Sequence, residues 1–317
     1  MIDESPTISV IMPCYNAEQH LDISLQSLQA QSFTNWQLIA VNDGSIDATW
    51  ALLENWALRD KRIHALDQVN TGAAKARNNG LSVVRGKYIA FLDADDTWHP
   101  DFLADTLNML SANPDTGIAY CGWQNIGLPG GQGEPYIPPD YESNNKLKVL
   151  LRDCPWPIHA ALIRTELIQE EGGFDEALSS CMDFDLWLRI ATKTQLVRVS
   201  KVLAYYHHHD NETRITKNLT RIAYNHWNVQ RKFIASLAQP QINLTKHELR
   251  NITHGELLHR GYQSYWARDL KAARNIFKRV MRQGYGKPKD WLYMLPSLLP
   301  LPIHKWLVAK ADRSSIS

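Results

Sequence analysis

Three carboxylates follow an apolar stretch of this chain within four residues. Residues 87–92 have the composition of a buried strand, and Asp93, Asp95 and Asp96 come directly after it. At the carboxyl end of a strand in an open α/β sheet, acids spaced D-x-D can hold Mg²⁺ or Mn²⁺ and leave coordination positions for a diphosphate. Asp95 or Asp96 could instead cap the helix expected near Asp101. The cluster alone therefore predicts either a divalent-cation site or a helix start.

The elements that would position these acids alternate between strand and helix over residues 8–122. Apolar runs without polar alternation predict strands at residues 8–12, 36–41, 62–66, 88–92 and 117–120, and helical spacing of apolar residues predicts helices between them. This rhythm predicts an α/β fold with a mixed, mostly parallel, Rossmann-like sheet and helices on both of its faces.

Polar residues recur where the predicted strands end. They are Pro13, Tyr15 and Asn16 after the first strand, Asp43 after the second, Asp67 after the third, and the acids of residues 93–96 after the fourth. Right-handed crossovers bring the carboxyl ends of parallel strands to one edge of a sheet. We therefore expect these residues to line one crevice.

The remainder of the chain changes character twice. Residues 127–143 are rich in glycine and proline and read as a surface loop, which could be a lid or a plain insertion. Strands are predicted at residues 158–163 and 202–207, with a helix at residues 182–191. From Leu219 onward the pattern is helical only. We therefore predict an α/β domain at residues 1–216 and a helical region at residues 217–317.

Charge separates the same two parts of the chain. Residues 217–317 contain 18 Lys and Arg against 5 Asp and Glu, whereas residues 1–216 contain 16 against 28. The basic part predicts an anionic partner, and either a membrane surface or the acidic part of the chain would satisfy it. Its cations are scattered among Trp, Leu and Pro in no nucleic-acid-binding module, so nucleic acid is not expected.

The C-terminal segment combines aromatic and basic residues. Residues 291–309 are apolar, but three prolines interrupt them, which makes a membrane span unfavourable. The segment could lie at a membrane interface or pack on the helices before it. The four cysteines form no C-x-x-C pair, and no basic, apolar leader is present. We therefore expect a cytoplasmic protein, peripheral on the inner face of the membrane if the interface prediction holds.

Four motifs occur in a fixed order in the first 96 residues: Pro13-Cys14-Tyr15-Asn16, Val41-Asn42-Asp43-Gly44-Ser45, Asn70-Thr71-Gly72 with Arg77-Asn78-Asn79-Gly80, and Phe91 to Asp96. Gly172-Gly173-Phe174-Asp175-Glu176 and Asp183 to Arg189 follow. This ordered set closely resembles the family 2 glycosyltransferases of GT-A fold, over about residues 7–213. The resemblance implies an inverting enzyme that moves a sugar from a UDP- or dTDP-linked donor to a hydroxyl acceptor in cell-surface glycan or glycolipid synthesis.

The resemblance also implies contacts to the donor. Asp43 would accept hydrogen bonds from the base, although it could instead be an Asx-turn acid. Pro13, Tyr15, Asn16 and Asp67 would contact the same part of the donor, with Tyr15 alternatively a packed aromatic residue. Arg77 would contact the diphosphate or form an ion pair with Asp93. Asp93 and Ala94 would contact the ribose or donor sugar.

The chemical step is expected to use a metal and one base. The resemblance assigns Asp95 and His209 to Mg²⁺ or Mn²⁺, which would neutralise the leaving diphosphate. Asp183 aligns with the family's base, although it could be a helix cap. Asp185 is the fallback base, and Met182 occupies the position before Asp183 where the family commonly has Glu.

Contacts to the acceptor or sugar are expected from Asp96, Asp185 and Trp156. Taken alone, Trp156 is better explained by core packing. Among the neighbouring histidines, His207 and His208 are expected at the surface or in the core, because consecutive strand residues point to opposite faces.

Two rival functions remain open on the sequence. Met182 could mark a catalytically silent glycan- or nucleotide-binding scaffold of the same fold. A sugar-nucleotide nucleotidyltransferase would share the α/β layout and acidic metal ligands, but it needs a glycine-rich, basic phosphate loop after the first strand. The residues at that place, Pro13 to Asn16, do not form one.

Overall fold

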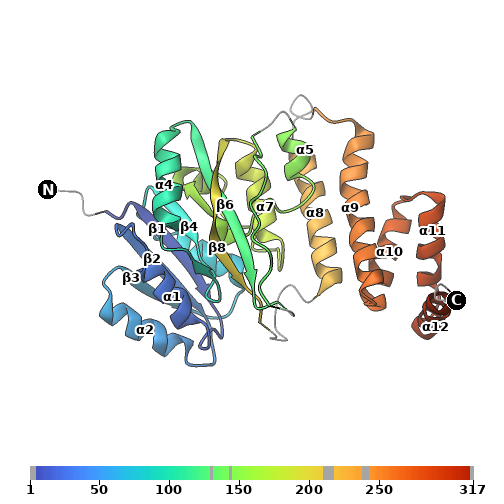
Figure 1. Ribbon diagram of the computed structural model, residues 1–317, viewed down its shortest axis with the longest axis horizontal. Helices are drawn as coiled ribbons and strands as arrows, with labels where there is room; N and C mark the ends of the chain where they lie inside the picture. The colour runs from blue at the N-terminus through green and yellow to red at the C-terminus, as the bar shows by residue number, and fades with distance from the viewer. Residues whose placement is uncertain (1–4, 129–130, 143–144, 210–217, 238–242, 315–317) are drawn as a thin grey trace. The chain divides into compact units, whose positions relative to one another are not determined.

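The computed structural model describes residues 5–128, 131–142, 145–209, 218–237 and 243–314 (Figure 1). The chain divides into two compact units. The first consists of Met1–Leu150 and Cys154–Asn211, and the second consists of Leu151–Asp153 and Glu212–Ser317. The predicted domain boundary between residues 216 and 217 lies outside the described residues and stays a prediction.

The first unit is organised around a mixed sheet of eight described strands in the order β3-β2-β1-β4-β7-β6-β8-β5. The strands are β1 (Ile8–Cys14), β2 (Trp36–Asp43), β3 (Ile63–Gln68), β4 (Tyr88–Phe91), β5 (Thr97–Trp98), β6 (Thr116–Ile126), β7 (Ala161–Arg164) and β8 (Gln195–His207). The pairs β1–β2, β2–β3, β1–β4 and β6–β8 are parallel, whereas β7 and β5 pair antiparallel to their neighbours. The predicted mixed, mostly parallel sheet is confirmed.

Seven α-helices connect the described strands of this unit. They are α1 (Leu21–Gln29), α2 (Thr49–Arg59), α3 (Ala73–Leu81), α4 (Phe102–Ala112), α5 (Lys146–Leu150), α6 (Thr165–Glu170) and α7 (Met182–Ala191). Helices α1 and α2 lie over the same face of the sheet in Figure 1. The chain returns past β1 to reach β4, so a right-handed crossover puts α3 on the opposite face.

This reversal of strand order places a switch point between β1 and β4. Ile11 of β1 lies beside Phe91 of β4, and both strands are buried almost completely. The chain leaves β1 toward Tyr15 and leaves β4 toward Asp93 at the same edge of the sheet. In an open α/β sheet, ligands bind in the crevice outside the strand ends at such a point.

The structure differs from the sequence-based prediction at four strands, one of which is β6, which continues to Ile126 instead of ending at residue 120. The two-residue strand β5 was not predicted, and residues 158–160 form a 3₁₀ turn before β7. Strand β8 begins at Gln195 instead of residue 202. The early part of β8 has few buried side chains, so it lacks the apolar run on which the prediction depended.

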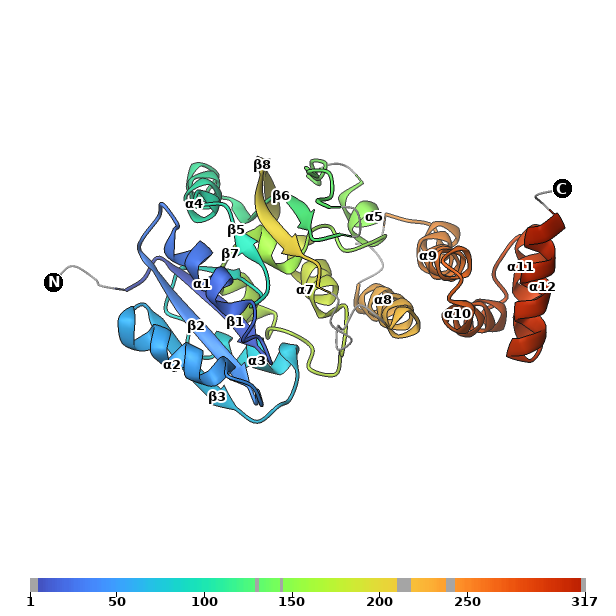
Figure 2. The ribbon, with the colours of Figure 1, turned by 60° about the horizontal axis from the view of Figure 1, so that its bottom comes forward.

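The second unit contains only helices among its described residues. They are α8 (Leu219–Ser236), α9 (Lys246–Trp266), α10 (Leu270–Arg282), α11 (Pro288–Met294) and α12 (Leu301–Ser314), with a 3₁₀ turn at Leu295–Leu298. Side chains of Asn218, Thr245 and Asp269 cap the first three helices. Figure 2 shows α9, α10, α11 and α12 of this unit one after another in chain order, ending at the C-terminus.

The helices of the second unit share one apolar core. Trp227 of α8, Leu257 of α9 and Phe277 of α10 are among its buried members. Gly261 allows α9 and α10 to approach closely, because a Cβ at that position would lie 2.7 Å from Phe277. The predicted helical C-terminal region is confirmed. No helix in the described part of the chain is long and apolar enough to cross a bilayer.

Candidate active site

The loops after β1 and β2 are joined at the switch-point edge. Asn16 has a φ of 48°, its backbone N–H donates to Ser45 Oγ at 3.0 Å, and its side-chain Oδ1 accepts from the Ile46 N–H at 2.9 Å. Tyr15 is 50% exposed beside it, so the packed-aromatic alternative is wrong. Asn16 thus fixes the segment that contains Pro13 and Tyr15 to the loop after β2.

Asp43 holds the start of α3. Its Oδ1 accepts from the Thr71 N–H at 2.8 Å and from Gln68 Nε2 at 2.7 Å, and its Oδ2 accepts from the Gly72 N–H at 2.8 Å. Gly44 lets the two loops meet, because a Cβ there would lie 2.6 Å from the Asn70 nitrogen. Asp43 is therefore buried and positions the Asn70-Thr71-Gly72 turn. Its contact with a base stays a prediction.

The Asp67 carboxylate lies on the neighbouring strand end. Asn42 and Asp67 are register partners in β2 and β3, and Asn42 Nδ2 donates to Asp67 Oδ1 at 2.7 Å. Asp67 is exposed at this edge of the sheet. The structure therefore brings Asp67 to the same rim as Asp43, as expected from the strand ends.

Arg77 connects the acid cluster to α7. Its Nη2 lies 2.5 Å from Asp93 Oδ1, and its Nη1 lies 3.3 Å from the sulfur of Met182. The side chain of Arg77 is 7% exposed, and that of Asp93 is 26% exposed. The predicted ion pair is present, and the thioether of Met182 lies against Nη1, the other terminal nitrogen of the guanidinium. A Glu at position 182 would give Arg77 a further carboxylate partner, which Met182 does not provide.

Asp183 lies beside this pair at the start of α7. The N-cap of α7 is Cys181, which has a φ of 59°, so the helix-cap alternative for Asp183 is wrong. Asp183 Oδ1 accepts from the Phe184 N–H at 2.9 Å, and the Cys154 thiol lies 3.7 Å from Oδ2. Desolvation by the surrounding protein raises the pKa of Asp183, although the Phe184 N–H and Arg77 oppose this. A carboxylate with a raised pKa in a polar crevice is suited to accept a proton.

The third acid of the cluster is a buried positioning residue. Asp96 Oδ2 lies 3.0 Å from His159 Nδ1, and its Oδ1 accepts from the His207 N–H at 2.9 Å. Burial lowers the pKa of His159, but the neighbouring carboxylates, Asp96 above all, raise it by more. The net shift of the His159 pKa is therefore upward. Because both side chains are enclosed, Asp96 cannot touch a sugar in this conformation. We revise its predicted acceptor role, and the helix-cap alternative is also wrong because α4 begins after Asp101.

Two other predicted acceptor contacts also lie inside the protein. Trp156 is 1% exposed and stacks on Tyr120 with ring centroids 4.6 Å apart. Asp185 is buried and accepts from Arg189 Nε at 2.8 Å, while Arg189 donates to the Gly173 carbonyl. Core packing explains Trp156, and fixing the 171–173 turn explains Asp185. We revise both roles, because neither side chain faces a space that an acceptor could enter.

Few side chains near the acid cluster are able to bind a metal ion. Ala94 is buried, and Asp95 is the partly exposed acid between Asp93 and Asp96. His209 Nε2 is buried without a hydrogen-bond partner in the described chain, and its ring stacks on His20 with centroids 3.7 Å apart. His207 is instead 2.9 Å from Thr97 Oγ1 through its Nε2.

No three His, Cys, Asp or Glu residues of the described chain are placed to hold a metal by themselves. Mg²⁺ is commonly bound by one or two carboxylates together with substrate phosphates. A divalent cation at this place would therefore need a substrate diphosphate to complete its coordination. Asp95 and His209 as its protein ligands stay a prediction.

Sequence reasoning missed the residues that support the site. The Asp96–His159 pair, the Asn16 bridge and the contact of Cys154 with Asp183 have no local motif, because their partners are distant in the chain. A buried acid at a strand end is the one available signal, since such a group requires a partner.

Comparison with known proteins supports the same family and fold. A sequence model described as "Glycosyl transferase family 2" matches residues 9–170, which is just over half of the chain. The chain is 33% identical over 190 residues to "Uncharacterized glycosyltransferase RP339" of Rickettsia prowazekii, and the match covers 58% of each chain. The chain spans 22%, 34% and 58% of the lengths of the first three curated relatives.

Solved structures resemble the chain over most of its length. TarS 1-349 of S. aureus, crystallised with UDP-GlcNAc, superposes with a TM-score of 0.65 at 19% identity, covering 86% of this chain and 81% of that one. The mannosyltransferase PcManGT from Pyrobaculum calidifontis, in complex with GDP-Man and Mn²⁺, superposes with a TM-score of 0.59 at 19% identity, covering 97% and 84%. These likenesses confirm the GT-A fold, and the match to the sequence model shows that the chain belongs to glycosyl transferase family 2.

Proposed function

We propose that the protein is an inverting, metal-dependent glycosyltransferase. It takes a sugar from a UDP- or dTDP-linked donor and transfers it to a hydroxyl group of a cell-surface glycan or glycolipid. The supporting observation is that Arg77, Asp93 and Asp183 lie together at the switch-point edge, where Arg77 and Asp93 are close enough to influence the Asp183 pKa.

The donor is expected along the carboxyl ends of β1 to β4. Its base would contact Asp43, Asp67 and the wall formed by Pro13, Tyr15 and Asn16, and its ribose and sugar would contact Asp93 and Ala94. Asp93 orients the Arg77 guanidinium and neutralises only part of its positive charge. Arg77 can therefore still contact a phosphate oxygen. Bound through Asp95 and His209, Mg²⁺ or Mn²⁺ would neutralise charge on the departing diphosphate.

Asp183 is the proposed base for the acceptor. In its ionised form it takes the proton of the attacking hydroxyl as the new bond to the anomeric carbon forms and the bond to the diphosphate breaks. One displacement at that carbon inverts its configuration. The raised pKa makes Asp183 a stronger base than an exposed aspartate, and the Phe184 N–H orients the carboxylate.

A donor screen tests this proposal. UDP-, dTDP- and GDP-linked sugars are incubated with the protein and Mg²⁺ or Mn²⁺, and the released nucleoside diphosphate is measured. We expect release with a UDP or dTDP donor that stops in EDTA, and Asp95→Asn should lose the metal dependence. Absence of release with every donor and metal would refute the proposal, and release with a GDP donor alone would correct the nucleotide.

The silent-scaffold alternative depends on Met182. Its sulfur contacts Arg77, but Asp183 keeps a position and an environment suited to a base. The two functions are separated by Asp183→Asn. An enzyme loses turnover and keeps donor binding, whereas a scaffold shows no turnover before or after the substitution.

We further propose that α11 and α12 contact a membrane surface that carries the acceptor. Leu292 is 73% exposed, Leu298 57% and Trp306 60%. Lys287, Lys289 and Lys305 lie in the same segment, and Asp290, one of its two acids, is buried. Exposed aromatic and aliphatic side chains beside lysines are typical of interfacial helices.

A further inference from the structure

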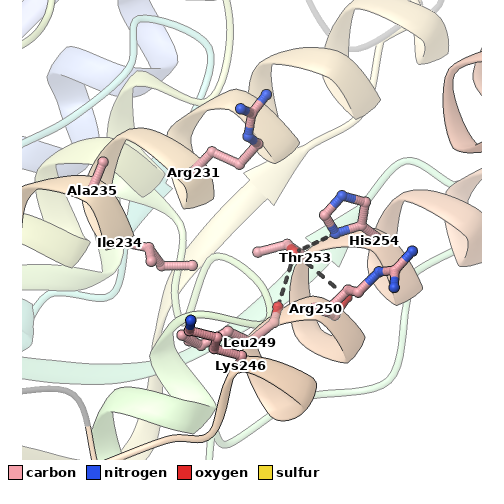
Figure 3. Close-up of a pocket in the computed structure, with 8 residues that line it drawn as sticks. All are labelled: Arg231, Ile234, Ala235, Lys246, Leu249, Arg250, Thr253 and His254. Atoms are coloured by element: carbon pink, nitrogen blue, oxygen red, sulfur yellow. Dashed lines mark hydrogen bonds between the residues drawn. The ribbon is translucent and has the colours of Figure 1, made fainter. Parts of the chain in front are cut away.

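A pocket of about 390 Å³ lies between the end of α8 and the beginning of α9 in the second unit (Figure 3). Its apolar part is formed by Ile234 and Ala235 of α8 and by Leu249 of α9. Its charged part consists of Arg231, Lys246 and Arg250. Ligand pockets commonly have volumes of about 300–1,000 Å³, so this pocket can hold a small ligand or part of a larger one.

The three cations of the pocket have no carboxylate partner among the residues that the structure describes. Within the described ranges, none of them forms an ion pair with a carboxylate. Arg260, further along the same helix α9, instead pairs with Asp153 at 2.9 Å and with Glu256 at 3.0 Å. On helix α9, carboxylates therefore neutralise Arg260, whereas the positive charge at the pocket stays without such a partner in the described chain.

Two of these cations are held in position without losing their charge. The guanidinium of Arg231 lies 4.6 Å from the centre of the Trp227 ring. Arg250 Nη2 donates to the carbonyls of Gln283 and Gly284 at 3.1 and 2.7 Å. A positioned guanidinium loses little freedom when it binds an anion, which favours recognition of phosphate.

A histidine lies beside these cations in the pocket. His254 Nδ1 lies 2.8 Å from Thr253 Oγ1, as the dashed line in Figure 3 shows. Burial lowers the pKa of His254 most, and the charge of Arg250 lowers it further. The pocket thus favours the neutral imidazole.

We propose that this pocket binds a lipid phosphate. The phosphate lies among Arg231, Lys246 and Arg250, and the first carbons of its hydrocarbon chain pack on Ile234, Ala235 and Leu249. The unpaired cations account for the anion, and the apolar side chains account for the attached chain. All the residues involved belong to the second unit, so the proposal does not depend on the glycosyltransferase reaction.

Calorimetric titration of the full chain tests the proposal. The probes are dodecyl phosphate below its micelle concentration, inorganic phosphate, and dodecyltrimethylammonium, which has the same chain and the opposite charge. We expect dodecyl phosphate to bind at least tenfold more tightly than inorganic phosphate and the cationic probe not to bind. Equal binding of the two phosphates would overturn the lipid assignment, and binding of the cationic probe with the same affinity would overturn the role of charge.

Substitutions then locate the binding site. Lys246→Gln removes one exposed charge, and Arg231→Gln with Arg250→Gln removes two. The matched control is Lys271→Gln with Lys278→Gln on α10, which changes the net charge of the same unit equally. We expect dodecyl phosphate affinity to fall at least threefold in the first variant and tenfold in the second, with the control unchanged.

Because Arg250 also contacts the end of α10, thermal unfolding of each variant is measured. Lys246→Gln has no such contact and tests the proposal even if the double variant unfolds. Wild-type affinity in folded Lys246→Gln, or equal loss in the α10 control, would refute this site.

Discussion

Two regions of the molecule, the strand ends of the first unit and the exposed surface of the second, differ in how their charged side chains are paired. At the strand ends of the first unit, Asp93 is paired with Arg77 and Asp96 with His159. In the second unit, the pocket cations have no carboxylate partner among the described residues, and large apolar side chains of α11 and α12 are exposed. Buried pairs fix groups for chemistry, whereas unpaired surface groups are available to partners. Substitutions at the strand ends of the first unit should therefore alter rate and stability, and substitutions at the exposed groups of the second unit should alter binding.

The largest expected effect is on the rate, at Asp183. Asp183→Asn removes the proposed base, so turnover should fall by about 10³- to 10⁴-fold. Donor affinity, measured by calorimetry, should change little. Asp115→Asn replaces an exposed acid of the same unit and serves as the control.

The pH profile gives Asp183 a second test. Its raised pKa means that the carboxylate is protonated, and the rate falls, at a higher pH than for an ordinary aspartate near 3.8. This acid limb should disappear from the residual activity of Asp183→Asn. A wild-type rate that stays constant down to pH 4, or a variant with full turnover, would contradict the assignment.

The second effect concerns stability at the Asp96–His159 pair. His159→Ala leaves the Asp96 carboxylate buried without its partner, which should lower the free energy of unfolding by about 3–5 kcal/mol. Urea denaturation measures this loss, and His64→Ala on the exposed side of β3 is the control. If the two substitutions have equal effects, the pair does not hold the acid cluster in place.

The sequence predicts the parts of the site that depend on local signals. Strands such as β2, with all eight residues buried, contain a short apolar run, here Leu38 to Val41, and a parallel sheet necessarily brings their carboxyl ends together. The order of strands and helices along the chain is therefore enough to place Asp43, Asp67 and Asp93 at one edge. The same reasoning predicts the helices of the second unit from spacing alone.

The remainder depends on pairings between distant segments. Whether Asp96 faces a ligand or the interior is decided by His159 and β8, and nothing in residues 93–96 indicates this. Trp156 likewise reads as a sugar platform or a core residue until Tyr120 is seen beside it. Side-chain direction at these positions is set by tertiary packing, which local patterns do not encode.

A third, smaller effect concerns His226, a deeply buried histidine of the second unit that is neutral at pH 7. Burial lowers the pKa of His226 to about 4, against about 6.5 in an unfolded chain. The folded state thus binds this proton less readily. Its contribution to stability is full above pH 6.5 and is lost as the pH falls toward 4, by about 3 kcal/mol.

Unfolding followed by far-UV circular dichroism between pH 7.5 and 4 measures this dependence. His226→Gln should flatten it, whereas His247→Gln, at an exposed position of α9, should not. An unchanged slope in His226→Gln would show that other groups control the acid sensitivity of this unit.

The smallest expected effect, about tenfold, is on membrane binding through α12. Trp306→Ser should weaken association with vesicles that contain anionic phospholipid by about one power of ten, because part of a large apolar side chain no longer enters the interface. Leu58→Ser removes an exposed apolar residue from the first unit, where Leu58 is 83% exposed, and should leave vesicle association unchanged. Raising the salt concentration should weaken the wild type, since the lysines of this segment attract the headgroups.

The same two variants distinguish two possible partners of α12, a lipid surface and a second copy of the chain. An exposed apolar face that pairs with itself would show a concentration-dependent mass in sedimentation, and Trp306→Ser would abolish it without lipid. An interfacial face stays monomeric in solution and loses only vesicle binding. Lys310 lies 5.3 Å from the centre of the Trp306 ring, so the cation and the aromatic ring reach the surface together. That arrangement suits an anionic headgroup layer better than an identical basic face, whose own lysine would be brought against it.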